Sequence, residues 1–577
     1  MAEVSRRAFV GKVAMAAGTI LLHNLRADCA VPAPSQSQAN AGTEEVLDVA
    51  IVGGGVSGIY SGWRMLMGDP TQLKILGRPV SDGRRLRVKV FEGSHRIGGR
   101  LLSARPPGMS SICELGGMRF VSAQKRVVAL ISELKLPHHR LYMYDPNNHA
   151  YVRGAHLRVS ELNNPSVLPY RLTAAEAECV RKYGPDVLVK CAISSLFPGV
   201  ESLHGDQLYK YVQTVEVGGR PLYQQGFWNV LADVMTPEAF ALSRATIGFD
   251  FPNTNAANVV LEYLRHTPDV TFQILDNGYD ALPWAIQERF ENAGGQVVQG
   301  AWLSGFRPVQ LADGSVGVQL DFRGGCQSVK AKAILLAMPK RSLELILPGC
   351  AVLADSASFE QLMNSVIPVG LNKIVLCYRQ PWWEATGVCR GVSFTDLPIR
   401  QCWYWSESQH AECSHGARDA IIMAYNNGWS IDFWEGLRPA DAGTRKFSDE
   451  CRRESHGSSD DRLRENWNHH LAPAEMVAEM HRQLLAIHNV PSAPDPVQAA
   501  YADWTDDPFG AGGHAWRQGA QSWAVLEPMT QPVPDFPCYI CGEAYSTTQG
   551  WVEGALQTAE IVLQKRLNLS APPWQPA

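Results

Sequence analysis

The stretch at residues 46–58 constrains the fold more than any other part of the chain. It reads VLDVAIVGGGVSG, and residues 49–52 form a short apolar run, as expected for a buried parallel strand. Gly53, Gly55 and Gly58 follow with the spacing G-x-G-x-x-G. The first glycine permits a tight turn, the second lets a pyrophosphate approach the backbone, and the third lets the next helix pack closely on the sheet. We therefore predict a strand, a turn and a helix over residues 57–67 whose N-terminus faces a phosphate.

A second predicted strand, residues 87–92, belongs to the same unit. It reads RVKVFE and ends in Glu92, where a dinucleotide site needs a carboxylate for the ribose hydroxyls. The usual distance from the glycines is about 20 residues, and a polar insertion at residues 69–85 lengthens it here. A glycine-rich turn in an unrelated α/β unit is the alternative interpretation.

The residues after Glu92 point to a family. They read GSHRIGGR, so two arginines flank a Gly-Gly pair. The glycines let a ligand approach the backbone, and arginine suits phosphate. The glycine motif, the acidic residue and R-x-G-G-R together resemble the fingerprints of the flavin-dependent amine oxidases. The resemblance implies FAD as the cofactor. It assigns FAD binding to Gly53, Gly55, Val56, Ser57, Gly58, Glu92, Gly93, Arg96, Gly99 and Arg100.

A C-terminal signature extends the resemblance. Residues 539–544 (YICGEA) end a predicted strand, and residues 549–555 (QGWVEGA) lead into a helix that runs to about residue 567. In the family, the acidic residue and the helix N-terminus hold the ribityl-pyrophosphate part of FAD, and a helix N-terminus beside flavin N1–C2=O favours the charge of the reduced ring. The resemblance adds Gly542, Glu543, Gly550, Trp551 and Val552 to the FAD-binding residues, together with Val298, whose strand touches adenine in the family.

Arg119 is the main indication of the substrate. It lies in ICELGGMRF, residues 112–120, where Gly116, Gly117 and Met118 are expected to contact FAD. The segment resembles the Gly-x-Met-Arg of the L-amino acid oxidases, whose arginine binds the α-carboxylate of the substrate and also lies at the cofactor. A planar guanidinium matches a carboxylate in a bidentate manner, and simple amines do not need it. A structural salt bridge is the alternative role.

Two further residues are assigned roles at the reacting centre by the same resemblance. Lys373 heads an apolar strand at residues 372–376; in the family the matching lysine hydrogen-bonds to flavin N5 through water and assists reoxidation. Tyr425, in a strand at residues 421–425, matches a tyrosine that joins the arginine on the carboxylate. A strand-end lysine that reaches solvent and a core tyrosine are the structural roles these two residues would otherwise have.

The remaining substrate contacts are predicted from three regions. Trp551 and the carbonyl of Gly550 match the residues that flank the substrate amine in the family. Trp516 ends a glycine-containing loop at residues 506–516, which lies near the flavin in the family. Asp250 is either a counter-charge for a basic substrate side chain or a helix cap or loop residue. The sixteen tryptophans hint at an aromatic pocket for a large side chain.

These residues together predict an FAD-dependent L-amino acid oxidase. Lys373, Arg119, Tyr425 and Trp551 are the expected catalytic residues; positioning supplies most of the catalysis, and the flavin supplies the chemistry. No general base is evident, and His266 is a weak candidate. An amino acid 2-monooxygenase, which gives an amide, has the same motifs. An amine or polyamine oxidase is a third possible function. A flavin-binding chaperone without turnover is a fourth, and the full set of site residues argues against it.

Length and composition fit an ordinary globular chain of more than one domain. It has 577 residues, of which 45% are hydrophobic and 19% charged, and a net charge of −5, which argues against nucleic acid or an anionic membrane as a partner. We expect an α/β fold of mixed character, the amine oxidase fold. Its predicted parts are a Rossmann-like FAD-binding domain (46–105, 277–348 and 532–569), a mixed-sheet substrate-binding domain (106–165 and 349–531) and a helical domain (166–276).

The N-terminus predicts export. Arg6 and Arg7 precede an apolar stretch at residues 13–22 that is too short to span a bilayer, which resembles a twin-arginine signal. An ordinary basic signal region is the alternative. We expect a bacterial export signal over residues 1–33, a linker over residues 34–45, and a periplasmic or secreted protein.

The cysteines predict neither a redox centre nor a metal site. The chain has 13 of them, widely scattered, so it is not a disulfide-dense scaffold. Cys538 and Cys541 have C-x-x-C spacing, but their apolar strand favours buried structural thiols. No cluster has metal-ligand order. Because residues 506–516 lack a cysteine, we expect noncovalent FAD. The expected partners are an L-amino acid, O2 and a second copy of the chain in a dimer.

Overall fold

A computed structural model describes residues 45–81, 83–265, 270–324, 326–405, 419–439 and 458–575. The predicted export signal, nearly all of the predicted linker and the candidate base His266 lie outside the described residues. Residues 45–577 form one compact unit.

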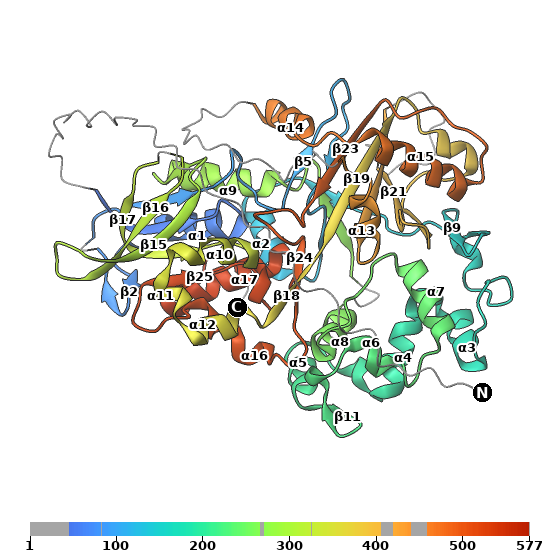
Figure 1. Ribbon diagram of the computed structural model, residues 1–577, viewed down its shortest axis with the longest axis horizontal. Helices are drawn as coiled ribbons and strands as arrows, with labels where there is room; N and C mark the ends of the chain where they lie inside the picture. Colours follow the sequence, from blue (N-terminus) through green and yellow to red (C-terminus); the bar gives the residue numbers. More distant parts are fainter. Residues whose placement is uncertain are drawn as a thin grey trace, which may run out of the picture. The chain divides into compact units, whose positions relative to one another are not determined.

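The first sheet is built on β1 (Val46–Val52), which is buried along almost its whole length. β1 pairs in parallel with β4 (Val88–Phe91) on one side and β17 (Val329–Leu336) on the other. β14 (Gln296–Val298) extends the parallel sheet beyond β4, and β25 (Cys538–Ile540) pairs in parallel with the second half of β17. β16 (Val316–Phe322) and β15 (Leu303–Gln310) add an antiparallel edge. The predicted strands of this region are confirmed (Figure 1).

Three helices pack together against this sheet: α1 (Val56–Met67), α9 (Ala281–Asn292) and α17 (Val552–Ile561). Gly58 permits the close approach of α1, because a Cβ there would lie 1.9 Å from the carbonyl oxygen of Gly53. Glu560 of α17 accepts hydrogen bonds from Tyr60 Oη (2.6 Å) and Arg64 Nε (2.9 Å) of α1. This buried ion pair joins the first and last motifs of the chain. A short π-helical turn (Val562–Arg566) continues α17 to the predicted end.

The second sheet is mainly antiparallel and is built from later parts of the chain. Its strand order is β10 (Ala155–Arg158), β9 (His149–Val152), β20 (Val392–Thr395), β21 (Gln401–Trp405), β22 (Ala420–Asn427), β19 (Leu371–Tyr378) and β23 (Gln498–Asp503). Lys373 of β19 and Tyr425 of β22 are directly opposite each other in the register. α15 (Ala474–His488) covers one face with Met476, Met480 and Leu484. The other face turns toward the segment that carries Arg119.

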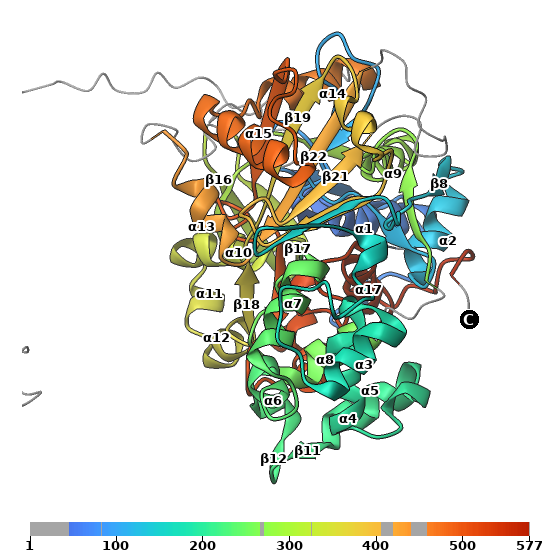
Figure 2. The ribbon, with the colours of Figure 1, turned by 90° about the vertical axis from the view of Figure 1, so that its right-hand side faces the viewer.

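Six helices form a separate core: α3 (Ala174–Tyr183), α4 (Leu188–Leu196), α5 (Gly205–Thr214), α6 (Phe227–Leu231), α7 (Pro237–Ile247) and α8 (Ala256–Arg265). Figure 2 shows them grouped below the sheets. The sequence predicts helices broken by Pro and Gly here, and Pro237 does begin α7 while Gly248 ends it with φ +69°. A disulfide between Cys179 and Cys191 joins α3 to α4.

Shorter elements connect these parts. Helix α2 (Lys125–Glu133) follows the segment that carries Arg119, and helix α10 (Lys340–Ile346) follows β17. Later connections contain four short helices: α11 (Ala351–Ala354), α12 (Ala357–Met363), α13 (Ser430–Glu435) and α16 (Ser522–Val525). The small strands are β2 (Lys74–Ile75), β3 (Arg78–Pro79), β5 (Ser103–Ala104), β6 (Cys113–Glu114), β7 (Phe120–Val121), β8 (His138–Arg140), β11 (Glu216–Val217), β12 (Arg220–Pro221), β13 (Phe272–Leu275), β18 (Val366–Val369) and β24 (Gly513–Trp516).

The polar sequence at the end of residues 438–470 is helical. Residues Ser459–Asn468 form helix α14, which is mostly exposed and has one buried face. Trp467 is 1% exposed and packs in the core beside the second sheet. Asn466 Nδ2 donates to the carbonyl of Ser103 at 2.8 Å. Two apolar side chains at helical spacing are enough to anchor an otherwise charged helix.

Candidate active site

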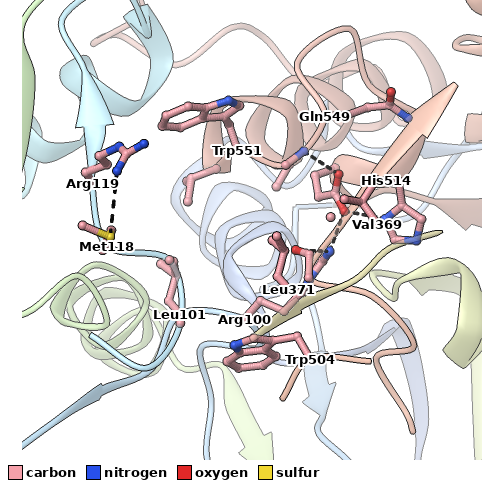
Figure 3. Close-up of a pocket in the computed structure, with 18 of the residues that line it drawn as sticks. Arg100, Leu101, Met118, Arg119, Val369, Leu371, Trp504, His514, Gln549 and Trp551 are labelled. Carbon is pink, nitrogen blue, oxygen red and sulfur yellow. Dashed lines mark hydrogen bonds and ion pairs between the residues drawn. The ribbon is translucent and has the colours of Figure 1, made fainter. Parts of the chain in front are cut away.

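A single continuous cavity of about 1270 Å³ reaches from the glycine turn after β1 to the helical group. Its walls come from the ends of the first sheet, one face of the second sheet, and helices α4, α8 and α17. Most residues predicted to bind the cofactor or the substrate line this one cavity, although they come from distant parts of the chain. Figure 3 shows Arg119 on one side of it and Arg100 with His514 on the other.

The glycine turn forms the innermost wall. Gly53 has φ +108°, and a Cβ there would lie 2.4 Å from the carbonyl oxygen of Ala337, so this turn requires glycine. At Gly55 a Cβ would meet only the Cα of Gly99, at 4.0 Å, so the backbone is open to the cavity. Gly55 is also the N-cap of α1 and supplies no side-chain cap. The first N–H groups of α1 are therefore available to an anion such as a pyrophosphate.

Glu92 follows β4 at the rim of this turn. Its carboxylate accepts hydrogen bonds from the backbone N–H of Gly54 (2.7 Å) and from Ser94 (2.8 Å to the backbone and 2.7 Å to the hydroxyl). Glu92 and Gly93 line the cavity, whereas Val298 does not. Val298 instead accepts a hydrogen bond from the backbone N–H of Glu92 at 2.8 Å. The cavity wall in this region is formed by Ala301 and Trp302 rather than by Val298, so its predicted contact with adenine stays a prediction.

The two arginines of R-x-G-G-R differ in position. Arg96 donates to the carbonyls of Ile97 and Leu101, each at 3.1 Å, and to that of Gly99 at 2.5 Å. It holds the positive-φ turn at Gly98 and Gly99 from behind and does not line the cavity. The expectation that Arg96 contacts the cofactor is therefore not supported by its placement. Gly58, buried between α1 and the sheet, likewise acts through packing.

Arg100 faces the cavity and pairs with Glu543, the acidic residue of the C-terminal signature (Figure 3). The carboxylate of Glu543 also accepts from His514 Nδ1 at 2.6 Å and from the backbone N–H of Gly550 at 2.8 Å. Burial opposes the charged form, but Arg100 and His514 hold the pKa of Glu543 well below its usual range. An ionised carboxylate thus fixes the loop, the arginine and the start of the last helix at one point.

The N-terminus of α17 is the second helix start on the cavity. Its N-cap is Trp551, which provides no side-chain hydrogen bond to the helix. Gly550, immediately before it, has φ +77° and open space where a Cβ would lie. The indole Nε1 of Trp551 donates to Glu262 Oε1 of α8 at 3.2 Å. The residues Gly542, Gly550, Trp551 and Val552 all line the cavity, as predicted for this signature.

Arg119 lies between two aromatic rings at the opposite wall. Its Cζ is 5.0 Å from the ring centre of Phe272 and 4.9 Å from that of Trp403, which is a cation–π arrangement. Within the described part of the chain the guanidinium forms no ion pair, and its buried Nε has no hydrogen-bond partner. Its one hydrogen bond is a weak contact to Met118 Sδ at 4.0 Å. Burial lowers the pKa of Arg119, but an arginine remains charged.

Tyr425 accompanies Arg119 in the cavity wall. Burial raises the pKa of its hydroxyl, and the charge of Arg119 partly offsets this. No described residue accepts or donates a hydrogen bond at this hydroxyl. An unpaired guanidinium and a neighbouring phenol form a binding place for an anion. A structural salt bridge, the alternative role for Arg119, is not present among the described residues.

Lys373 is buried beneath the same wall. Its Nζ donates to the carbonyls of Gly116 (2.6 Å) and Glu114 (3.1 Å). Burial lowers the pKa of Lys373, and the nearby Glu114 carboxylate partly opposes this. Burial raises the pKa of Glu114 in turn. Lys373 does not reach solvent at a strand end, and it lines the cavity.

Of the two further residues predicted to contact the substrate, Trp516 lines the cavity and Asp250 does not. Trp516 is buried and lines the cavity, while its Nε1 donates to the carbonyl of Ser546 at 3.3 Å. Asp250 does not line the cavity. Its carboxylate pairs with Arg244 at 2.7 Å and Arg400 at 3.0 Å. The position of Asp250 therefore fits the structural alternative and not a counter-charge for a substrate.

The comparisons with known proteins agree with this geometry. The sequence model of the family described as flavin containing amine oxidoreductase matches residues 80–454 and 459–562. The chain belongs to this family. The family resemblance expected from the motifs is thereby confirmed, and the protein is a flavin-dependent oxidoreductase.

Individual relatives are distant. Aplysianin-A of Aplysia kurodai is 26% identical over 560 residues, which cover 90% of each chain. An L-amino-acid oxidase of Mus musculus is 24% identical over 376 residues, which cover 63% of this chain and 52% of that protein. A flavin-dependent L-tryptophan oxidase of Lentzea aerocolonigenes is 21% identical, covering 89% of this chain and 96% of that protein.

Solved structures confirm the predicted fold. A putrescine oxidase structure aligns with a TM-score of 0.61 at 16% identity and covers 90% of this chain and 99% of that one. A cyclohexylamine oxidase from Brevibacterium oxydans gives 0.59 at 17% identity, with 90% and 98% covered. The mixed architecture of this oxidoreductase is therefore the amine oxidase fold.

The residues present fit the flavin cofactor that the family implies. Two helix N-termini without side-chain caps, those of α1 and α17, lie on one cavity with a glycine turn that leaves the backbone open. Arg100, paired with Glu543, adds a guanidinium to the wall of the same cavity. These are the donors that a pyrophosphate and the polar edge of a flavin require.

Two residues of the cavity are missed by the sequence analysis. His514 follows a Gly-Gly pair inside the loop already assigned to the flavin, so its position directly after these glycines is a usable signal. Glu262 lies on α8, where polar and apolar residues alternate at helical spacing, and nothing in the sequence separates it from a surface residue. Cys538 and Cys541 are buried free thiols, and burial raises the pKa of Cys541 to about 12, as expected for structural cysteines.

The described part of the chain has neither a candidate metal site nor a helix suited to span a membrane. The described residues contain no group of three or more His, Cys, Asp or Glu side chains arranged to hold a metal ion. None of their helices has the combination of length and apolar character that crossing a bilayer requires.

Proposed function

We propose that this oxidoreductase is an FAD-dependent L-amino acid oxidase. The observation that carries the proposal is Arg119, a charged side chain in the wall of the cavity with no ion pair among the described residues. Leaving a charge without a partner in such a place is unfavourable unless a ligand supplies the counter-charge. An α-carboxylate supplies it, with the Tyr425 hydroxyl as a second donor; a simple amine does not.

The reaction is an oxidative deamination. An L-amino acid, O2 and water give a 2-oxo acid, ammonia and H2O2. The Cα–H bond breaks with its electron pair and the amine loses a proton, which gives an imino acid that water hydrolyses. FAD, which the helix starts of α1 and α17 and Arg100 would hold, would supply the acceptor for this hydride and would return the two electrons to O2.

The protein residues position the substrate for this chemistry. Arg119 and Tyr425 hold the carboxylate, and Trp551 with the Gly550 carbonyl bounds the space for the amine at the start of α17. Fixing two ends of the substrate restricts the direction of the Cα–H bond. Lys373 is proposed to move protons during reoxidation, and the lowering of its pKa to about 7 by burial supports this role.

FAD is proposed to bind without a covalent bond, and the protein is proposed to be exported through its Arg6-Arg7 signal and to form a dimer. Acid precipitation of the purified protein tests the first point, because noncovalent FAD stays in the supernatant. N-terminal sequencing of the exported protein and light scattering test the other two.

The deciding experiment is product analysis with the purified yellow protein. Each of the twenty L-amino acids is supplied with O2, and H2O2 and ammonia are measured together. Equal amounts of both establish the oxidase. Uptake of O2 with an amide and neither product would identify the monooxygenase. Oxidation of amines but of no amino acid would overturn the proposed role of Arg119.

A further inference from the structure

The two walls of the cavity carry opposite charge. The wall formed by the sheets is basic, and the wall formed by the helical group is mainly acidic. Apart from Glu92, Arg100, His514 and Glu543 of the proposed cofactor site, the charged residues that line the cavity in the described part of the chain are Arg119, Arg140 and Lys373 on the sheet wall and Asp186, Lys190, Glu201 and Glu262 on the helical wall.

Glu262 is the acidic residue of the helical wall that contacts a residue of the proposed reacting centre. It lies on α8, and its Oε1 accepts the hydrogen bond of Trp551 Nε1 at 3.2 Å. Trp551 in turn is the N-cap of α17 and lines the same cavity as Arg119 (Figure 3). Glu262 lines this cavity too, so a substrate bound there meets a wall that carries the Glu262 charge.

Asp186 continues the acidic wall further out. It lies in the short helical turn Pro185–Val187 between α3 and α4, which the Cys179–Cys191 disulfide ties together. Its side chain is exposed, lines the cavity and forms no ion pair with a described residue. Gly184 makes room for it, because a Cβ there would lie 2.9 Å from Asp186 Oδ1.

The space between the charged walls is aromatic. Phe249, Phe251 and Tyr263 line the helical side, and the rings of Phe251 and Tyr263 are 5.0 Å apart. Burial keeps the pKa of Tyr263 well above its ordinary value, so this tyrosine is neutral. Aromatic faces pack against an aliphatic chain and attract a cation at its end.

We infer that the cavity selects L-amino acids with a positively charged side chain, with Glu262 as the main counter-charge and Asp186 as a second one. The inference rests on the proposed function, because it requires an α-carboxylate at Arg119. The aliphatic stem lies along the aromatic wall, and the terminal cation reaches the acidic side. Glu262, and not Asp250, is thus the proposed counter-charge for a basic substrate side chain.

Two cationic residues of the cavity, Arg140 and Lys190, would favour an acidic substrate side chain instead. Arg140 is exposed and stacks over Tyr142, with its Cζ 5.2 Å from the ring centre. Lys190 is partly exposed on α4 and forms no ion pair with a described residue. If these two dominate, the enzyme prefers an acidic side chain instead. Arg140 is exposed and is therefore screened by solvent more strongly than the partly buried Glu262, whereas Lys190 is partly buried like Glu262 and is the stronger competitor.

The test compares L-arginine with L-citrulline, which has nearly the same shape and no charge. We expect kcat/KM for L-arginine to exceed that for L-citrulline by more than about tenfold, the ratio that one partly desolvated charge pair supports. Glu262→Gln keeps an oxygen that accepts from Trp551, so it removes the charge alone. This variant lowers the arginine-to-citrulline ratio by about tenfold, and Asp186→Asn lowers it less.

Glu216→Gln is the matched control, because Glu216 is exposed on β11 of the same helical group and does not line the cavity. We expect the arginine-to-citrulline ratio of kcat/KM for Glu216→Gln to equal that of the wild type. Equal rates for L-arginine and L-citrulline, or a ratio that Glu262→Gln leaves unchanged, overturn the inference while the oxidase activity stands. Failure of every L-amino acid to give H2O2 refutes the proposed function itself, which is a distinguishable result.

Discussion

Replacement of Arg119 by methionine is the sharpest test of the proposed carboxylate site. A bidentate contact consists of two charge-assisted hydrogen bonds, each worth about 1.5–3 kcal/mol. Because the guanidinium is partly accessible through the cavity, the lower end applies, and the expected loss is roughly 3 kcal/mol. We therefore expect kcat/KM for the best amino acid to fall by about 10²-fold.

The same variant leaves the fold intact. Arg119 has no ion pair with a described residue, so Arg119→Met strands no buried carboxylate, and methionine packs well between the rings of Phe272 and Trp403. The unfolding midpoint shifts by no more than about 2 °C, as measured by differential scanning fluorimetry, and the flavin absorbance is retained.

Two comparisons isolate the carboxylate. Arg140→Gln removes a positive charge from the exposed rim of the same cavity and lowers kcat/KM by less than about threefold. The decarboxylated amine of the best substrate, which has no carboxylate to lose, reacts equally slowly with wild type and Arg119→Met. A loss below tenfold for the amino acid, or an equal loss for the amine, would refute the assignment.

The other predictions concern the cofactor, the proton at Lys373 and acid stability. Glu543→Gln leaves Arg100 without its buried partner and yields protein with less than about half of the flavin per chain, read from the absorbance ratio, because breaking such a pair costs about 3–5 kcal/mol; full occupancy would contradict this. Lys373→Met slows reaction of the reduced enzyme with O2 by about 10²-fold or more in stopped-flow mixing, and an unchanged rate removes Lys373 from reoxidation. Burial lowers the pKa of His488 to about 4, so the folded protein keeps this histidine neutral while the unfolded chain protonates it near pH 6.5. The free energy of unfolding is therefore unaffected by His488 above pH 6.5 and falls by roughly 3 kcal/mol as the pH is lowered to 4. Urea unfolding measures the free energy of unfolding at pH 7 and at pH 4.5, and the difference between the two values is smaller for His488→Gln than for the wild type. An equal difference in the two proteins excludes His488 as a cause of the acid sensitivity.

The sequence predicts best where local geometry decides the outcome. Gly53 and Gly58 are recognisable because a Cβ at either position would collide with backbone, so the spacing itself encodes the strand, turn and helix. The C-terminal signature is recognisable for a similar reason, since Gly550 has a positive φ and directly precedes the N-cap of α17. The placement of these residues on one cavity follows from the fold.

Prediction fails where a long side chain has a choice of partners. Arg96 and Arg100 flank the same Gly-Gly pair, yet Arg96 turns back to the carbonyls of the turn while Arg100 reaches Glu543. The positive φ values of Gly98 and Gly99 decide which guanidinium faces outward, and the sequence does not reveal them. His514 is missed because its role depends on the same distant carboxylate.

The acidic residues show why charge alone does not identify a substrate contact. Asp250 pairs with two arginines and Glu543 with an arginine and a histidine, so the protein itself satisfies both. Asp186 lines the cavity without such a partner, and Arg119 is its cationic counterpart on the opposite wall. A charge that the fold neutralises serves the fold. Arg119 is half-buried and forms no ion pair with a described residue, so its charge is kept at a cost in stability. Asp186 is exposed, so its charge is solvated at little cost, and it remains available to a ligand in the cavity. Two charges of opposite sign that no described residue pairs, on opposite walls, therefore favour a substrate that itself carries both signs.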